Sequence, residues 1–217
     1  KDVFYMYYSA EEHVCVATSS SPKGPFKQDV KEPMLADKAI DNSLFIDEDG
    51  KAYLSFVRFT NGIEIWVSEL EDDLKTIKEN TLKPVLQMSQ EWEMVWPKVN
   101  EGSFIVKHKD LYYMTYSANS FESQFYGVGY ATATTPMGPW TKYDENPILQ
   151  NPEDLVGVGH SAMFRDADDD LNIVFHAHHS KWDIHPRGMY IAKVIFTSDK
   201  IPIMQIEGNV IHTKVLK

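Results

Sequence analysis

Hydrophobic and polar residues alternate through four copies of one pattern along the chain. Each copy has a polar turn followed by an apolar, alternating run, which is typical of a hairpin turn and the strand after it. The copies are KDVFYMYYSA (1–10), DEDGKAYLSFV (47–57), HKDLYYMTYSA (108–118) and DADDDLNIVFHA (166–177). The three later copies follow a Phe-containing stretch, LFID, SFIV or MFRD, which the first copy lacks. A unit of strand, hairpin and strand therefore recurs, and the chain opens inside one.

A third strand is predicted after each hairpin. These runs are VCVATS (14–19), IEIWVSEL (63–70), YGVGYATA (126–133) and MYIAKVIF (189–196). Turns rich in Pro and Gly follow the first and third runs, and a short outer strand after such a turn, as in residues 141–150, completes a four-stranded unit. The polar segment 71–80 is expected to be a loop. Repeats of this length and strand content predict an all-β fold built from blades of a β-propeller.

The charge of the 217-residue chain argues against two classes of partner. The formal net charge is -11, with 32 acidic residues against 21 Lys and Arg. A phosphate backbone or an anionic bilayer would be repelled, so neither nucleic acid nor a membrane is an expected partner. Cys15 is the only cysteine, which excludes an intrachain disulfide or a thiolate metal cluster. Inside its apolar run we expect Cys15 to be buried.

Three ionisable residues precede the Phe-containing stretches in AIDNSLF (39–45), VNEGSF (99–104) and VGHSAMF (158–164). Counted back from each Phe, Asp41 lies at minus four, Glu101 at minus three and His160 at minus four. The innermost strands of a propeller surround a channel, so we expect these side chains to converge there. Two carboxylates from separate strands suit glycoside hydrolysis, which needs an acid and a base or nucleophile. Taken singly, each residue also has a structural explanation; the shared register favours a site.

Other polar and aromatic features lead to weaker hypotheses. The tract 176–185 has four histidines, but alternate strand positions face opposite sides, so a closed metal shell is not expected. The acidic run 166–170 lacks the glycine and terminal glutamate of an EF-hand and is predicted to be a solvated turn. Trp92, Trp96 and Trp182 lie near predicted channel-end loops, where they stack on a sugar or pack against the protein.

Four stretches together resemble glycoside hydrolase family 43. They are residues 39–56, 99–121, 126–149 and 158–164. The resemblance implies a five-bladed propeller that hydrolyses arabinose- or xylose-containing plant polysaccharides with inversion. About four blades would be present in a single domain, 1–217. Blade 2 would run from residue 1, blade 3 over about 39–90, blade 4 over about 97–150 and blade 5 over about 157–217.

The resemblance also implies roles for individual residues. Glu101 matches the general acid in the family's Asn-Glu-Gly stretch, and Asp41 matches the carboxylate that raises the pKa of that acid and orients it. His160 matches a channel histidine associated with a bound Ca²⁺ or its waters, and is expected to bind substrate or metal. Arg187 resembles a last-blade arginine that reaches the sugar. Trp96 is the aromatic residue that we expect to bind substrate.

The family's general base, an Asp on the first blade, has no match in this chain. Three explanations stay open: the first blade precedes Lys1, the chain is a remnant that binds sugars without cutting them, or another chain closes the ring. The first hypothesis is an α-L-arabinofuranosidase or β-xylosidase acting on chain ends, because residues 117–133 are most similar to such members. The alternative is a carbohydrate-binding propeller without turnover. A four-bladed propeller for protein interaction would leave the three ionisable residues unexplained.

Overall fold

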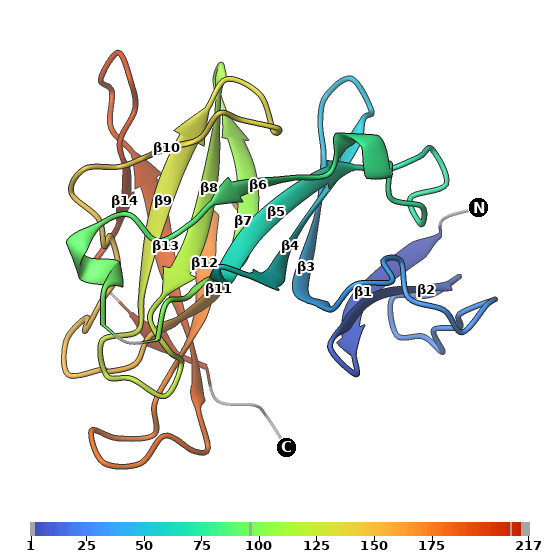
Figure 1. Cartoon of the computed structure of the whole chain (residues 1–217). Coiled ribbons are helices and arrows are strands. Elements are labelled where there is room, and N and C mark those ends of the chain that lie inside the picture. Colours follow the sequence, from blue (N-terminus) through green and yellow to red (C-terminus); the bar gives the residue numbers. More distant parts are fainter. Residues whose placement is uncertain (1–2, 96, 209, 214–217) are drawn as a thin grey trace.

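The computed structural model describes residues 3–95, 97–208 and 210–213, and these form four antiparallel sheets (Figure 1). The first sheet pairs β1 (Phe4–Ala10) with β2 (His13–Ser19). The second contains β3 (Ala39–Ile46), β4 (Ala52–Thr60), β5 (Gly62–Glu69) and β6 (Lys83–Leu86). The third contains β7 (Asn100–His108), β8 (Leu111–Ala118), β9 (Gly127–Ala133) and β10 (Thr141–Lys142). The fourth contains β11 (Gly159–Arg165), β12 (Leu171–Ala177), β13 (Gly188–Phe196), β14 (Met204–Ile206) and β15 (Ile211–His212).

This architecture confirms the all-β prediction and the recurring unit of strand, hairpin and strand. Among the described residues the helices are two 3₁₀ turns, η1 (Glu79–Thr81) and η2 (Glu91–Glu93). Segment 71–80 is a loop apart from the start of η1, as expected. No helix within the described part is long and apolar enough to cross a membrane.

The sheets pack face to face in chain order, from the blue to the red end of the ribbon in Figure 1. Strand β8 shows how the alternation of the sequence produces this arrangement. Met114 and Tyr116 lie in a core with Val57 and Ile65 of the second sheet. Tyr113, on the opposite face, lies in the core shared with the fourth sheet. Because alternate side chains of a strand point to opposite faces, one strand contributes to two cores, as expected of stacked blades.

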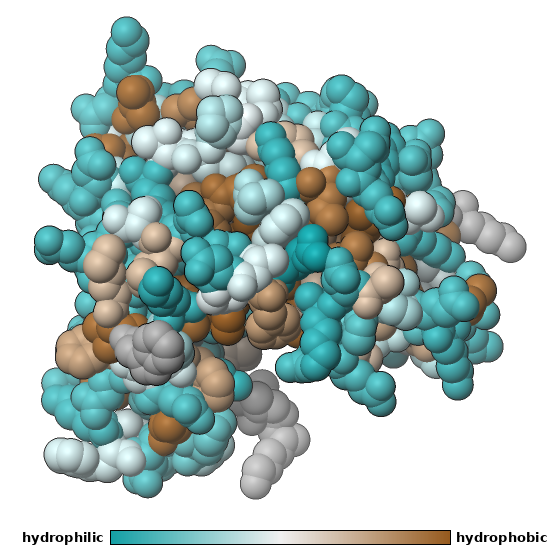
Figure 2. Space-filling model, in the orientation of Figure 1, coloured by the Kyte–Doolittle hydropathy of each residue, from teal (hydrophilic) through white to brown (hydrophobic). Residues whose placement is uncertain are grey.

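The face of the molecule shown in Figure 2 is mostly polar, with hydrophobic residues gathered in the middle of the view. Two smaller expectations are confirmed here. Cys15 is 7% exposed and has no disulfide partner. The acidic run 166–170 is a solvated turn, in which a carboxylate oxygen of Asp166 accepts hydrogen bonds from the backbone N–H groups of Asp168 and Asp170.

Candidate active site

Each innermost strand of the last three sheets carries a β-bulge at the same level. The register shifts between Ile40 and Ser43, between Glu101 and Phe104, and between Gly159 and Ala162. The residue after each break is in the left-handed region, with φ of 59° at Asp41, 58° at Gly102 and 49° at His160. Bulges are common beside active sites because they re-aim side chains. The three bulges thus mark one level of the molecule.

The bulges correct the register that the sequence suggested. Asp41 and His160 are equivalent positions, but the residue equivalent to them in β7 is Gly102, and Glu101 comes one position earlier. The three Phe residues are not equivalent, because Phe104 is the first paired residue after its bulge, whereas Phe45 and Phe164 lie two residues beyond the first paired residues, Ser43 and Ala162. The shared register counted from them was therefore wrong for Glu101.

The structure nevertheless brings four predicted site residues together. Asp41, Glu101, His160 and Arg187 line one pocket with a volume of about 370 Å³. The other lining residues are Ile40, Ile63, Pro97, Val99, Ser120 and Phe121. A neighbouring pocket of about 660 Å³ shares His160 and Arg187. The site therefore combines two carboxyl groups, an imidazole and a guanidinium from four separate segments. Trp96 lies outside the described residues.

Burial makes the Glu101 carboxyl group a weaker acid than an exposed glutamate. Desolvation raises its pKa, and the nearby charge of Asp41 raises it further. A hydrogen bond from the Tyr126 hydroxyl to Oε1, 2.6 Å long, and the positive charge of Arg187 act in the opposite direction. The pKa of Glu101 is about 7, which leaves much of this group protonated near neutral pH. A carboxylic acid in this state can donate a proton.

Asp41 is held beside Glu101 by its backbone. Burial raises the pKa of the Asp41 carboxyl group, while the charge of His160 and a hydrogen bond from the Gly102 N–H lower it. The Asp41 N–H donates to Ser9 Oγ at 3.2 Å. Gly102 also lets the imidazole approach, since a Cβ there would lie 3.2 Å from His160 Cγ. The bulges therefore place Asp41, Gly102 and His160 in mutual contact range.

Arg187 packs against two rings at the mouth of the site. One guanidinium nitrogen lies 3.4 Å from each ring nitrogen of His176, and Cζ lies 5.2 Å from the centre of the Phe121 ring. Burial first, and then the charge of Arg187, lowers the pKa of His176 to about 4. The imidazole is thus neutral near pH 7 and does not repel the cation that it supports.

Two residues of the site were missed by the sequence reasoning. Tyr126, fully buried, donates to Glu101, and Ser117 Oγ accepts the backbone N–H of His160 at 2.7 Å. Neither residue has an ionisable side chain near neutral pH, so neither attracted notice. The signal was indirect: a Cβ at Gly159 would lie 2.1 Å from Tyr126 Cε1, so the Gly before His160 makes room for the ring.

The two described tryptophan candidates lie in different surroundings. Trp92 packs in the core, where its ring contacts Tyr116 and fills the space over Gly129, and its Nε1 donates to Gln90. Trp182 is 90% exposed in the loop after β12. Trp92 is therefore a packing residue.

A family model described as "Glycosyl hydrolases family 43" matches residues 1–202. The chain belongs to glycosyl hydrolase family 43. It is similar to a solved structure titled "Endo-1,4-beta-xylanase" from Bacteroides thetaiotaomicron, with a TM-score of 0.94 and 50% identity, covering 99% of this chain and 74% of that one. A thermostable family-43 glycoside hydrolase gives a TM-score of 0.86 and 36% identity over 95% of this chain and 72% of that one.

A curated relative carries a different sugar in its name. "Beta-D-galactofuranosidase xynD" of Aspergillus niger is 29% identical over 184 residues, which are 80% of this chain and 50% of that protein. This family-43 chain thus spans about half the length of that relative.

The calcium ion that the family resemblance implies was tested against the residues beside His160. Ca²⁺ takes six to eight oxygen ligands. Among the described residues, no group of three or more His, Cys, Asp or Glu could hold a metal. A calcium site at His160 would therefore need further oxygen ligands, such as water or backbone carbonyls.

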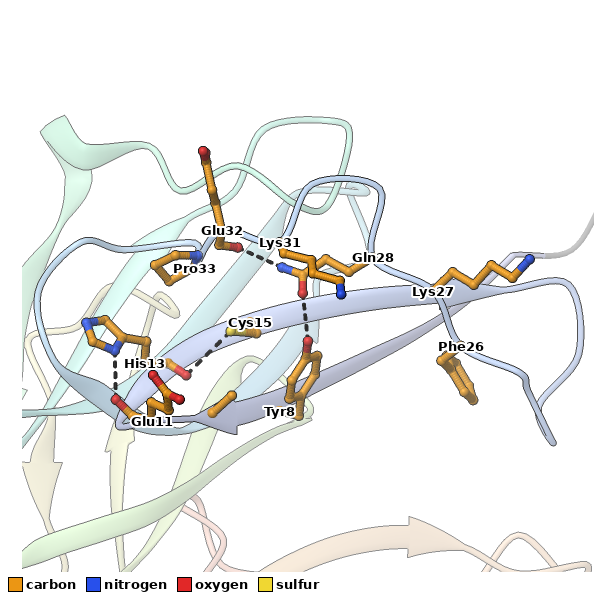
Figure 3. Close-up of a pocket in the computed structure, with 11 residues that line it drawn as sticks. Tyr8, Glu11, His13, Cys15, Phe26, Lys27, Gln28, Lys31, Glu32 and Pro33 are labelled. Atoms are coloured by element: carbon orange, nitrogen blue, oxygen red, sulfur yellow. Dashed lines mark hydrogen bonds between the residues drawn. The ribbon is translucent and has the colours of Figure 1, made fainter.

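A further pocket of about 850 Å³ lies on one face of β1 and β2, apart from the family-43 site (Figure 3). Tyr8, Gln28 and the carbonyl of Glu32 form a chain of hydrogen bonds across it. Burial raises the pKa of the Cys15 thiol, which is thus protonated and a poor nucleophile. Glu11 and Glu32 also line this pocket, but their side chains point away from each other in Figure 3.

Proposed function

We propose that the full-length protein is a glycosidase that cleaves arabinose- or xylose-containing plant polysaccharides or oligosaccharides with inversion. The observation that carries this proposal is the pair of Glu101 and Asp41 in one pocket, with the pKa of Glu101 at about 7. Glu101 would protonate the leaving glycosidic oxygen. Asp41 would oppose ionisation of Glu101 by its charge, and Arg187 would bind the sugar.

An inverting reaction also needs a base that activates water on the opposite face of the sugar, roughly 6.5–9.5 Å from the acid. Glu101 and Asp41 are the carboxyl groups among the residues that line this pocket. We infer that the base lies on a further blade of a five-bladed propeller, with this chain contributing about four blades as one domain. The greater length of the solved relatives supports this inference, since the chain covers 74% and 72% of the two described above.

Substitution of the acid tests the proposal. The full-length protein and its Glu101→Gln variant would be compared on aryl α-L-arabinofuranosides and β-D-xylosides, and NMR would follow the anomer released. We expect a loss of roughly 10² to 10⁴-fold, smaller for aryl groups that leave easily, because these need less protonation. Glu145→Gln, at an exposed glutamate in the turn after β10, is the matched control. Equal rates for wild type and Glu101→Gln would contradict the assignment.

The sugar is tested with the same assay. The names of the relatives differ in sugar, so an aryl β-D-galactofuranoside belongs in the panel. The binding-only alternative predicts saturable binding of an oligosaccharide without product. The three relatives described above are all named as hydrolytic enzymes and give it no support.

Calcium near His160 stays a prediction. Because no group of three or more His, Cys, Asp or Glu among the described residues could hold the ion, its ligands would include water, backbone or amide oxygens, or groups outside the described part. Melting temperatures of the full-length protein in EDTA, and again after added Ca²⁺, test this; equal values would contradict a structural ion.

A further inference from the structure

Tyr126 contacts Glu101, the proposed acid, but is not among the residues that line the pocket. It immediately precedes β9 and is fully buried. Its hydroxyl lies 2.6 Å from Glu101 Oε1. Burial raises the pKa of Tyr126 well above its usual value, and the neighbouring Glu101 charge raises it further. The phenol therefore keeps its proton near neutral pH, where it can act as a hydrogen-bond donor.

The direction of the hydrogen bonds around this phenol is fixed by a backbone group. The His160 N–H can only donate, and it donates to Ser117 Oγ. The Ser117 hydroxyl also lies near the Tyr126 hydroxyl and lowers its pKa, which is the effect of a hydrogen-bond donor. With one lone pair occupied by the N–H, Ser117 has its proton available for the Tyr126 oxygen. The Tyr126 proton is then directed to Glu101 Oε1.

We propose that Tyr126 is a positioning residue for Glu101, which holds Oε1 as a hydrogen-bond acceptor so that the acid carries its proton on Oε2. This inference rests on the proposed function of Glu101. A carboxylic acid that can bear its proton on either oxygen would spend part of its time in an unproductive state. The chain of groups from His160 through Ser117 and Tyr126 removes that freedom, and it links the bulge of β11 to the acid on β7.

The ring of Tyr126 is held in place independently of its hydroxyl. One face stacks on His176, with ring centres 5.5 Å apart and an angle of 15° between the planes. The ring also lies over Gly159, where a Cβ would come within 2.1 Å. A phenylalanine at this position would keep both contacts. Tyr126→Phe therefore removes the hydrogen bond and leaves the packing.

The charged groups that face Glu101 predict the sign of the effect. They are Asp41 from β3 and Arg187 from the loop before β13, and Tyr126→Phe leaves both in place. A hydrogen bond to a carboxylate favours the ionised form. Loss of this hydrogen bond therefore raises the pKa of Glu101. The alkaline limb of the kcat profile, which is the fall of kcat as the pH rises and Glu101 loses its proton, would shift to a pH higher by about one unit. We expect kcat at the optimum to fall about 10-fold, because Oε2 is no longer the fixed proton site.

The experiment compares pH profiles of kcat and KM for full-length wild type, Tyr126→Phe and Glu101→Gln on an aryl glycoside with a poor leaving group. Tyr130→Phe, a buried tyrosine on β9, is the matched control and should keep the wild-type profile. KM should change less than twofold in Tyr126→Phe, since its hydroxyl faces the acid. Should Tyr126→Phe fail to fold, Ser117→Ala gives a second test, with a smaller shift in the same direction.

The outcomes separate the two proposals. An inactive Glu101→Gln together with an unmoved alkaline limb in Tyr126→Phe would overturn the positioning role and leave the glycosidase assignment intact. An active Glu101→Gln would overturn the proposed function itself. A limb that moves upward in Tyr126→Phe, with KM retained and Tyr130→Phe unchanged, supports the inference.

Discussion

Removal of Lys142 should destabilise the protein more than removal of any exposed lysine. Its ammonium group lies 2.5 and 2.8 Å from the two carboxylate oxygens of Glu93, and the Glu93 side chain is 0% exposed. The same carboxylate accepts hydrogen bonds from the N–H groups of Ser89 and Gln90 and from the Tyr116 hydroxyl. These hydrogen bonds, together with Lys142, lower the pKa of Glu93 against the effect of burial.

Lys142→Met leaves the carboxylate buried with neutral donors and no cation. Breaking a buried pair in this way costs about 3–5 kcal/mol, against a total stability of roughly 5–15 kcal/mol. In wild type the lowered pKa of Glu93 stabilises the fold above the unfolded pKa, and this contribution is lost as the pH falls through the folded pKa. In the variant burial is no longer opposed by a cation, so Glu93 takes up a proton more easily. The deficit should therefore shrink between pH 8 and pH 5.

Urea unfolding of the full-length protein, followed by tryptophan fluorescence at both pH values, measures this deficit. Lys193→Met is the matched control: its pair with Asp170 has the same chemistry, but the two side chains are 41% and 47% exposed, so little change is expected. Lys142→Met with Glu93→Gln should recover part of the loss, because no buried charge remains. A deficit below about 1 kcal/mol, or one that is equal at pH 5 and pH 8, would refute the reasoning.

Two further predictions concern the site. The rate of hydrolysis should decline as the pH rises through about 7, where Glu101 loses its proton. Asp41→Asn should move this decline to lower pH, because the negative charge that raises the pKa of Glu101 is removed; a decline at an unchanged pH would contradict this effect of Asp41. Gly159→Ala should destabilise the fold by about 1–3 kcal/mol, seen as a lower melting temperature, and reduce activity, because the added Cβ meets the Tyr126 ring. Gly208→Ala is the control and should change neither, because nothing lies within 4 Å of the added Cβ.

The strand units could be predicted because their signal is local. Alternation in a run such as 111–118, preceded by a polar turn, specifies a strand and its two faces without reference to the rest of the fold. The position of Trp92 could not be predicted in this way. Its place in the core depends on Gly129, 37 positions further along the chain, whose missing side chain leaves the space that the ring fills.

The site was predictable in its ionisable residues and not in its hydrogen bonds. Asp41, Glu101 and His160 could be found because each stands three or four positions before the Phe of its strand, in three successive repeats. The exact register could not, because the bulges depend on left-handed backbone conformations at Asp41 and His160 that the sequence alone did not reveal. Tyr126 was read as the start of a strand, since its partner Glu101 lies 25 positions earlier.

The repeated phrase itself explains why the bulges can exist. A bulge removes a backbone N–H from the ladder, and a buried N–H needs another acceptor. Ser9 of MYYSA accepts the N–H of Asp41, and Ser117 of MTYSA, at the same place in its phrase, accepts that of His160. In the second phrase the position of this serine is occupied by Val57, whose side chain cannot accept a hydrogen bond. The N–H of Gly102, in the bulge of β7, interacts with the Asp41 carboxylate instead. Asp41 thus takes the place of the missing serine as the acceptor. The interaction of its carboxylate with the Gly102 N–H also keeps that carboxylate beside Glu101.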